Sequence, residues 1–239
     1  MRSTIGLLPI LVALVACSDN TPIETAAPQL PSPLPETATV ATSTEFNSER
    51  NAYFGDLHVH TMYSYDAFIF GTTSSPDDAY SFAKGASLTH PAGFEMKLDV
   101  PLDFYGVTDH AYYLGVLRAM ALGDSDVARH EVAAGMDLLG DDVTYRRSMF
   151  AKFRDFARSD RRMEIMDVDV VKSAWDDIVA AANRHNDPGN FTAFVAYEYT
   201  SSGSEYENLH RNVIFRDGDA PDLPFSRLDS TNPEDLWEW

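Results

Sequence analysis

Residues 53–60 read Tyr-Phe-Gly-Asp-Leu-His-Val-His and have the length and the alternation of a β-strand. Side chains two positions apart in a strand point to the same side, so we expect His58 and His60 to share one face. Two imidazoles placed in this way can close on a single metal ion. Together with nearby carboxylates they form a ligand set for Zn, Mn or Fe rather than for Ca or Mg.

Strands and helices alternate along the rest of the chain. Further strands are predicted for residues 102–107, 191–199 and 209–215, and helices for residues 76–84, 111–122, 144–159 and 173–184. Ser75 is suited to be the N-cap of the first helix, with Pro76 at its first position, and Ser173 can cap the last one. Strands alternating with helices predict an α/β fold.

The composition excludes several classes of protein. The 239 residues include 37 acidic and 18 basic side chains, for a net charge of −19, which argues against a nucleic-acid partner. A hydrophobic content of 44% is normal for a packed core and excludes wholesale disorder. Cys17 is the single cysteine, so a disulfide within one chain is impossible.

The N-terminus has the pattern of a secretory signal peptide. Arg2 precedes an apolar run over residues 5–16, which is shorter than the roughly 20 residues needed to cross a bilayer. The run ends in Leu-Val-Ala-Cys at residues 14–17 and resembles the lipobox of bacterial lipoproteins, which implies a lipid anchor at Cys17. The alternative is an ordinary signal peptide with an incidental cysteine. By the same resemblance, Ser18 favours the outer membrane of the bacterial cell envelope over the inner one.

Three segments follow from these patterns. Residues 1–17 are predicted to be the signal peptide. Residues 18–50, rich in Pro, Thr and Ala, are predicted to form an extended tether, because proline removes amide donors and little apolar surface is present to bury. Residues 51–239 are left for the globular domain.

Several motifs in the domain resemble those of a known superfamily. Residues 55–64, Gly-Asp-Leu-His-Val-His-Thr-Met-Tyr-Ser, resemble the first motif of the polymerase-and-histidinol-phosphatase (PHP) superfamily, an H-x-H pair followed by a serine four positions on. Residues 107–110, Val-Thr-Asp-His, resemble its second motif. Over residues 53–239 the chain resembles a bacterial branch catalogued as domain of unknown function 3604, through the runs at residues 76–85, 101–104, 197–201 and 208–215.

The resemblance implies a fold and a set of ligands. The implied fold is a distorted (β/α) barrel of the PHP type, with two or three divalent Zn, Mn or Fe ions at the C-terminal ends of its strands. The implied ligands are His58 and His60 on one ion, His110 on its neighbour, Glu198 as a bridge, and Asp66 and His210 as further donors.

Two more residues complete the candidate site. Asp109 belongs to the candidate catalytic set because a ligating imidazole usually needs a carboxylate or a carbonyl on its other ring nitrogen, so we expect Asp109 to orient the ligands. Arg211 is a candidate substrate-binding residue, since its guanidinium suits two phosphate oxygens at once. The alternative for Arg211 is a place on the outer surface, because alternation along the strand points it away from His210.

These residues predict a metal-dependent hydrolase, foremost a phosphoesterase that uses a metal-bound hydroxide on a small-molecule phosphate ester. One alternative is an amidohydrolase-like enzyme acting on C–N or C–O bonds, because those barrels also begin with H-x-H. Another is a surface lipoprotein that binds a metal or a ligand without catalysis.

The later histidine motif and the C-terminal D-x-H of the superfamily do not occur in the sequence. Residues 232–235, Asn-Pro-Glu-Asp, have the chemistry of a helix start, but Trp239 leaves room for about one turn. We therefore expect the chain to be the N-terminal part of a longer protein, with an incomplete barrel.

Overall fold

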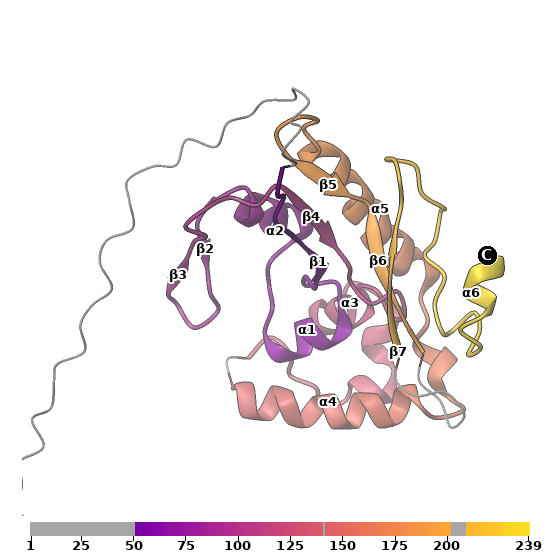
Figure 1. Cartoon of the computed structure of the whole chain (residues 1–239). Helices are drawn as coiled ribbons and strands as arrows, with labels where there is room; N and C mark the ends of the chain where they lie inside the picture. Colours follow the sequence, from indigo (N-terminus) through magenta and orange to yellow (C-terminus); the bar gives the residue numbers. More distant parts are fainter. Residues whose placement is uncertain (1–50, 141, 202–208) are drawn as a thin grey trace, which may run out of the picture. The chain divides into compact units, whose positions relative to one another are not determined.

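The computed structural model describes residues 51–140, 142–201 and 209–239 (Figure 1). Cys17, the predicted signal peptide and the predicted tether lie outside these ranges. No helix within the described ranges is long and apolar enough to cross a membrane.

A three-stranded parallel sheet lies at the centre of the domain. Its strands are β1 (Gly55–Val59), β4 (Phe104–Val107) and β5 (Thr192–Phe194), in the order β1-β4-β5. Gly55 pairs with Phe104, and Phe104 pairs with Thr192, so all three strands end on the same side. The parallel sheet with its helices confirms the predicted α/β class. The strands that the structure describes do not close into a barrel.

The single strand predicted for residues 191–199 is wrong, because the chain forms two strands there. β5 pairs with β4, whereas β6 (Ala196–Ser201) pairs antiparallel with β7 (Leu209–Ile214). The break falls at Val195, whose carbonyl accepts a hydrogen bond from Phe215 N at 2.9 Å instead of continuing the ladder with β4. One parallel bridge, between His110 and Glu198, connects β6 to the segment that follows β4.

Helices cover the sheet and contribute most of the core. They are α1 (Tyr65–Phe70), α2 (Pro76–Ala83), α3 (Val116–Leu122), α4 (Val143–Ala157), α5 (Val168–His185) and α6 (Asp235–Glu238). Short 3-10 turns occur at Asp126–Arg129, Glu131–Ala133 and Arg162–Ile165, and the hairpin β2–β3 joins Leu88–Thr89 to Glu95–Met96. α2 and α5 pack against each other and against β4, and α1 packs against α3 and α4.

The helix caps explain which predicted boundaries were right. Ser75 Oγ accepts a hydrogen bond from Asp78 N, and Asp78 Oδ2 accepts one from Ser75 N at 2.9 Å, so the predicted N-cap of α2 is confirmed, and the structure shows that it forms a capping box with Asp78. Ser173 is not the N-cap of α5, because the helix begins five residues earlier. Its cap is Asp167, whose carboxylate accepts from Asp169 N and Val170 N.

α3 begins at Val116 rather than at the predicted residue 111. Tyr113 has a φ of 58° and Gly115 a φ of 73°, and neither angle fits an α-helix, so the chain turns before the helix starts. Gly115 N donates to Tyr63 O at 2.8 Å, which ties this turn to the segment after β1. The turn therefore places α3 beside the strand end that carries His58 and His60.

Two glycines in the left-handed region flank α3 and provide a test of this packing. A Cβ on Gly115 would lie 2.9 Å from the Cβ of Ala174 in α5, whereas a Cβ on Gly123 would meet nothing within 4 Å. We expect Gly123→Ala to lower the free energy of unfolding by about 1–2 kcal/mol through backbone strain. Gly115→Ala should lower the free energy of unfolding by this amount and by roughly 1–3 kcal/mol more, because its Cβ overlaps with Ala174. Urea denaturation measures both losses, and equal losses would contradict the close approach of α3 and α5.

Candidate metal centre

Four imidazoles gather around one carboxylate at the C-terminal ends of the parallel strands β1 and β4. His58 lies on β1 and His60 directly after it, His110 follows β4, Glu198 lies on β6 and His210 on β7. The ring centroids are 5.2 Å apart for His58 and His60, 4.8 Å for His60 and His110, and 5.7 Å for His110 and His210. Segments separated by up to about 150 positions in the sequence therefore meet in one place.

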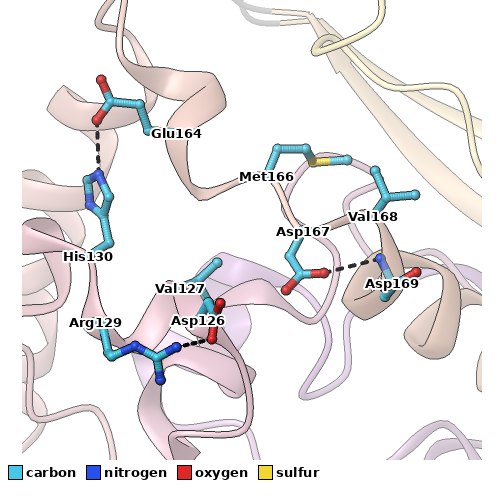
Figure 2. Close-up of a pocket in the computed structure, with 9 residues that line it drawn as sticks. All are labelled: Asp126, Val127, Arg129, His130, Glu164, Met166, Asp167, Val168 and Asp169. Carbon is cyan, nitrogen blue, oxygen red and sulfur yellow. Dashed lines mark hydrogen bonds and ion pairs between the residues drawn. The ribbon is translucent and has the colours of Figure 1, made fainter.

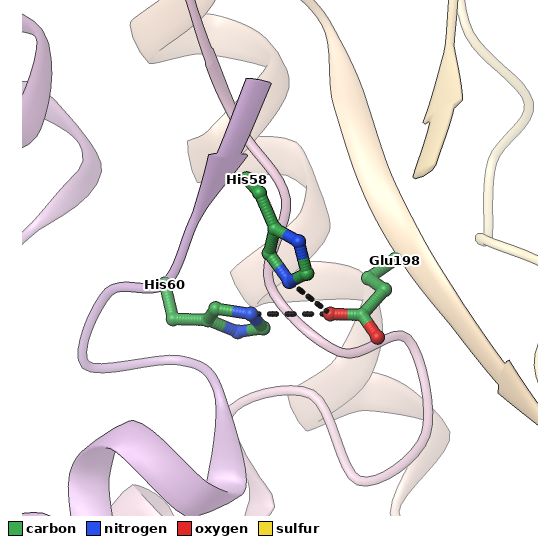
Figure 3. Close-up of side chains that lie close together, drawn as sticks. All are labelled: His58, His60 and Glu198. Carbon is green, nitrogen blue, oxygen red and sulfur yellow. Dashed lines mark hydrogen bonds and ion pairs between the residues drawn. The ribbon is translucent and has the colours of Figure 1, made fainter. Parts of the chain in front are cut away.

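Glu198 is the centre of this cluster and has no exposed surface. Its Oε2 lies 3.1 Å from His58 Nε2 and 3.1 Å from His60 Nε2 (Figure 3). Its Oε1 accepts from Thr200 Oγ1 at 2.7 Å and also contacts His210 Nδ1. Burial alone would raise the pKa of Glu198, but the surrounding imidazoles and the Thr200 hydroxyl outweigh burial and lower this pKa to about 2. The carboxylate is therefore ionised at neutral pH.

Asp66 supplies a second carboxylate from the first turn of α1. Its Oδ2 lies 3.3 Å from His110 Nε2, and its Oδ1 accepts from Ser64 Oγ at 2.7 Å and lies 3.9 Å from His60 Nδ1. Burial opposes ionisation of Asp66, but the hydrogen bond and the charge of His110 outweigh burial and hold the pKa well below its usual range.

All six predicted ligands thus lie in three overlapping groups that could hold a metal ion. Within each group the donor atoms lie within 4.8 Å of one another: His58, His60 and Glu198; His60, Asp66 and His110; and His110, Glu198 and His210. Two donors bound at 2.0–2.1 Å to one tetrahedral ion are about 3.3 Å apart. The distances of 3.1 Å from Glu198 Oε2 to His58 and to His60 are close to that separation.

The hydrogen bonds of His60 provide a further test of whether a cation fits. Ser64 has one hydroxyl proton, which it donates to Asp66, since a carboxylate can only accept. His60 Nδ1, 2.8 Å from Ser64 Oγ, must then donate to Ser64. A neutral His60 would therefore point the lone pair of Nε2 at Glu198 Oε2. The Nε2 lone pair and the negatively charged Glu198 Oε2 would repel each other. A proton or a metal ion between these two atoms removes that repulsion.

The pKa of His60 agrees with this need for positive charge. Burial would lower the pKa of His60, but the hydrogen bond to Glu198 and the charges of Asp66 and Asp109 outweigh burial and raise it. The donor set and its electrostatics therefore fit a divalent cation.

Asp109 holds the chain next to the ligands. It is fully buried, and its two carboxylate oxygens accept from Thr61 N and Thr61 Oγ1, each at 2.5 Å. Its own carbonyl accepts from Glu198 N at 2.9 Å. Burial raises the pKa of Asp109 to about 6, although the Thr61 bonds oppose this shift. Asp109 therefore positions His60 through its chain neighbour Thr61. It positions Glu198 through its own backbone carbonyl.

Arg211 lies opposite Tyr199 in the β6–β7 register, whereas Asn212 lies opposite Glu198. Alternation therefore places Arg211 on the face away from Glu198, where its side chain is exposed and donates to the His210 carbonyl. This position agrees with the outer-surface alternative, and the geometry gives the predicted phosphate clamp no support.

Sequence reasoning missed two residues of the site. Thr200 contacts Glu198, His110 and His210, and Asn212 Nδ2 donates to the Leu57 carbonyl at 2.6 Å, which joins β7 to β1. The signal for both was present, because each lies two positions from a predicted ligand on the same strand and therefore on the same face.

A pocket with other lining residues lies beside the start of α5 (Figure 2). Two pairs of its side chains contact each other: His130 Nε2 with Glu164 at 2.9 Å, and Arg129 with Asp126. None of the six predicted ligands lines this pocket.

The fold and the site define a class: a mixed α/β protein with a cluster of histidines and carboxylates that could hold a metal ion. Residues 47–239 match the model of a family described as "Protein of unknown function (DUF3604)". The chain belongs to this family, as the sequence predicted. The comparisons with curated proteins and with solved structures gave no match.

Two threonines that each donate to a carboxylate test the buried network next to the ligands. The Thr61 hydroxyl donates to Asp109 in the interior, and the Thr89 hydroxyl donates to Glu95 at 2.6 Å on the exposed β2–β3 hairpin. Thr61→Val should lower the free energy of unfolding by about 1.5–3 kcal/mol, because a buried charge loses a donor. Thr89→Val should change it by less than about 0.5 kcal/mol. Similar losses in urea denaturation would show that the Asp109 network does not stabilise the fold.

Proposed function

We propose that this protein is a metal-dependent hydrolase of the PHP type that cleaves small-molecule phosphate esters. The observation that carries the proposal is the convergence of four imidazoles and two carboxylates on one site, with Glu198 shared between two of the ligand groups. Nitrogen and carboxylate donors suit Zn, Mn or Fe, and the overlap of the groups favours two or three ions. In this proposal the open parallel sheet is part of a distorted (β/α) barrel.

The cluster has a buried side and a side that is exposed to solvent. Glu198 and His110 are buried, whereas the side chains of His58 and His210 are 52% and 39% exposed. A substrate therefore approaches from the side of His58 and His210. Divalent ions held here would lower the pKa of bound water from 15.7 toward about 7 and offset the charge of a phosphoryl group. Glu198 and Asp66 stay ionised and keep the ligand positions fixed.

The choice of a phosphate ester rests on the resemblance of residues 55–64 and 107–110 to the PHP motifs. The same donors could serve an amidohydrolase-like reaction at C–N or C–O bonds, since a fold does not name its substrate. The resemblance of residues 14–17 to a lipobox adds a proposed location, with the domain anchored to the bacterial envelope through Cys17 and with Ser18 favouring the outer membrane.

The test measures the hydrolysis of p-nitrophenyl phosphate and of its bis ester by the full chain with Mn²⁺ or Zn²⁺ added. We expect metal-dependent turnover and a loss of at least about 100-fold in a His58→Ala/His60→Ala variant, because two ligands of one ion are removed. The matched control is His130→Ala/His185→Ala. These histidines also pair with carboxylates, Glu164 at 2.9 Å and Asp77 at 3.0 Å, but outside the cluster. The control should keep its turnover within about twofold.

Bound metal is measured by elemental analysis of the same samples. If the protein binds metal through His58 and His60 but does not hydrolyse the phosphate esters, the proposed phosphoesterase activity is contradicted. That outcome would favour the amidohydrolase or the non-catalytic alternative. Equal metal content in both double variants would contradict the ligand assignment itself.

A further inference from the structure

Thr200 contacts all three members of one candidate ligand group, namely His110, Glu198 and His210. It lies on β6 two residues after Glu198, is 2% exposed, and belongs to none of the three groups. Its Oγ1 lies 2.7 Å from Glu198 Oε1, 2.8 Å from His110 Nδ1 and 3.3 Å from His210 Nδ1. One buried hydroxyl therefore contacts the central carboxylate and two imidazoles.

The number of protons available fixes the direction of these bonds. A threonine hydroxyl has one proton, and an ionised carboxylate can only accept, so Thr200 donates to Glu198. Thr200 must then accept from His110, which requires the hydrogen of the His110 ring to be on Nδ1. The lone pair of a neutral His110 is left on Nε2, 3.3 Å from Asp66 Oδ2.

This tautomer decides which of the two overlapping groups includes His110. His110 Nε2 faces Asp66, in the group that also includes His60. His110 Nδ1 lies 3.6 Å from Glu198 Oε1, in the group that also includes His210. A ring nitrogen that carries a hydrogen cannot bind a metal, so a bond from Nδ1 to Thr200 leaves only the Asp66 side. The Ser64 hydroxyl accepts from His60 Nδ1 and donates to Asp66 in the same way.

We propose that Thr200 is a positioning residue that holds His110 in the Nδ1–H tautomer and so assigns this ligand to the Asp66 side of the cluster. The tautomer preference is a property of the chain itself. Its effect on metal binding rests on the function proposed above. Thr200 touches neither a metal nor a substrate in this role, and it acts through His110.

The first test is long-range ¹H–¹⁵N NMR of the histidine rings in the metal-free full chain, at a pH where the imidazoles are neutral. We expect His110 to be in the Nδ1–H form in the wild type and in Thr200→Ser, which keeps the hydroxyl. Thr200→Val has nearly the same shape without the hydroxyl and should move His110 toward the Nε2–H form. An Nε2–H ring in the wild type, or an unchanged tautomer in Thr200→Val, would overturn the proposal.

The second readout is calorimetric titration of the same proteins with Zn²⁺. Thr200→Val should weaken the binding of one ion by about 10–100-fold, and Thr200→Ser should stay within about threefold of the wild type. Wild-type affinity in Thr200→Val would overturn the positioning role but leave the phosphoesterase proposal intact. Conversely, a wild type that binds metal and shows the expected tautomers without hydrolysing phosphate esters would refute only the phosphoesterase.

Discussion

A carboxylate with no access to solvent determines how this domain is assembled. Burying an unpaired charge costs several kcal/mol, so Glu198 must be surrounded by donors or cations. Its two oxygens contact His58, His60, His210 and Thr200, which come from β1, the segment after β1, β7 and β6. The cluster therefore forms only when these segments are folded together.

The backbone around Glu198 provides the rigidity that the cluster requires. Glu198 N donates to the Asp109 carbonyl and Ala111 N donates to the Glu198 carbonyl, both at 2.9 Å, so β6 is fixed to the end of β4 on either side of His110. Asp109 in turn holds Thr61 directly after His60. The ligands are thus positioned by main-chain and buried hydroxyl contacts, while α2 and α5 supply the apolar packing around the sheet.

The sequence predicted those parts of the fold that depend on local chemistry. β1 and β4 follow from alternation, and the start of α2 follows from Ser75, Pro76 and Asp78, which act within a few residues of one another. α1 was not predicted, because its six residues are too few to show a helical period. The break at Val195 was missed as well, since it arises from a hydrogen bond with Phe215, 20 positions away.

The site, like the fold, could be predicted where the signal is local in the sequence and not where it depends on long-range contacts. The resemblance to the PHP motifs supplied all six candidate ligands, and three of them, His58, His60 and His110, lie in the local patterns H-x-H and Thr-Asp-His. Alternation along β6 is enough to place Thr200 on the face of Glu198, but its contacts with His110 and His210 could not be predicted, because they depend on the pairing of β6 with β7 and on the bridge from Glu198 to His110. Arg211 shows the converse, as strand alternation alone already indicated its place on the outer face.

The central claim is that the imidazoles gathered around Glu198 bind divalent metal. The most direct measurement is an anomalous difference map from crystals of the full chain grown with Zn²⁺ and recorded at the zinc absorption edge. The account predicts the strongest peak at about 2.0–2.2 Å from the Nε2 atoms of His58 and His60 and from Glu198 Oε2. A map whose peaks lie only among surface carboxylates, with none beside Glu198, would contradict it.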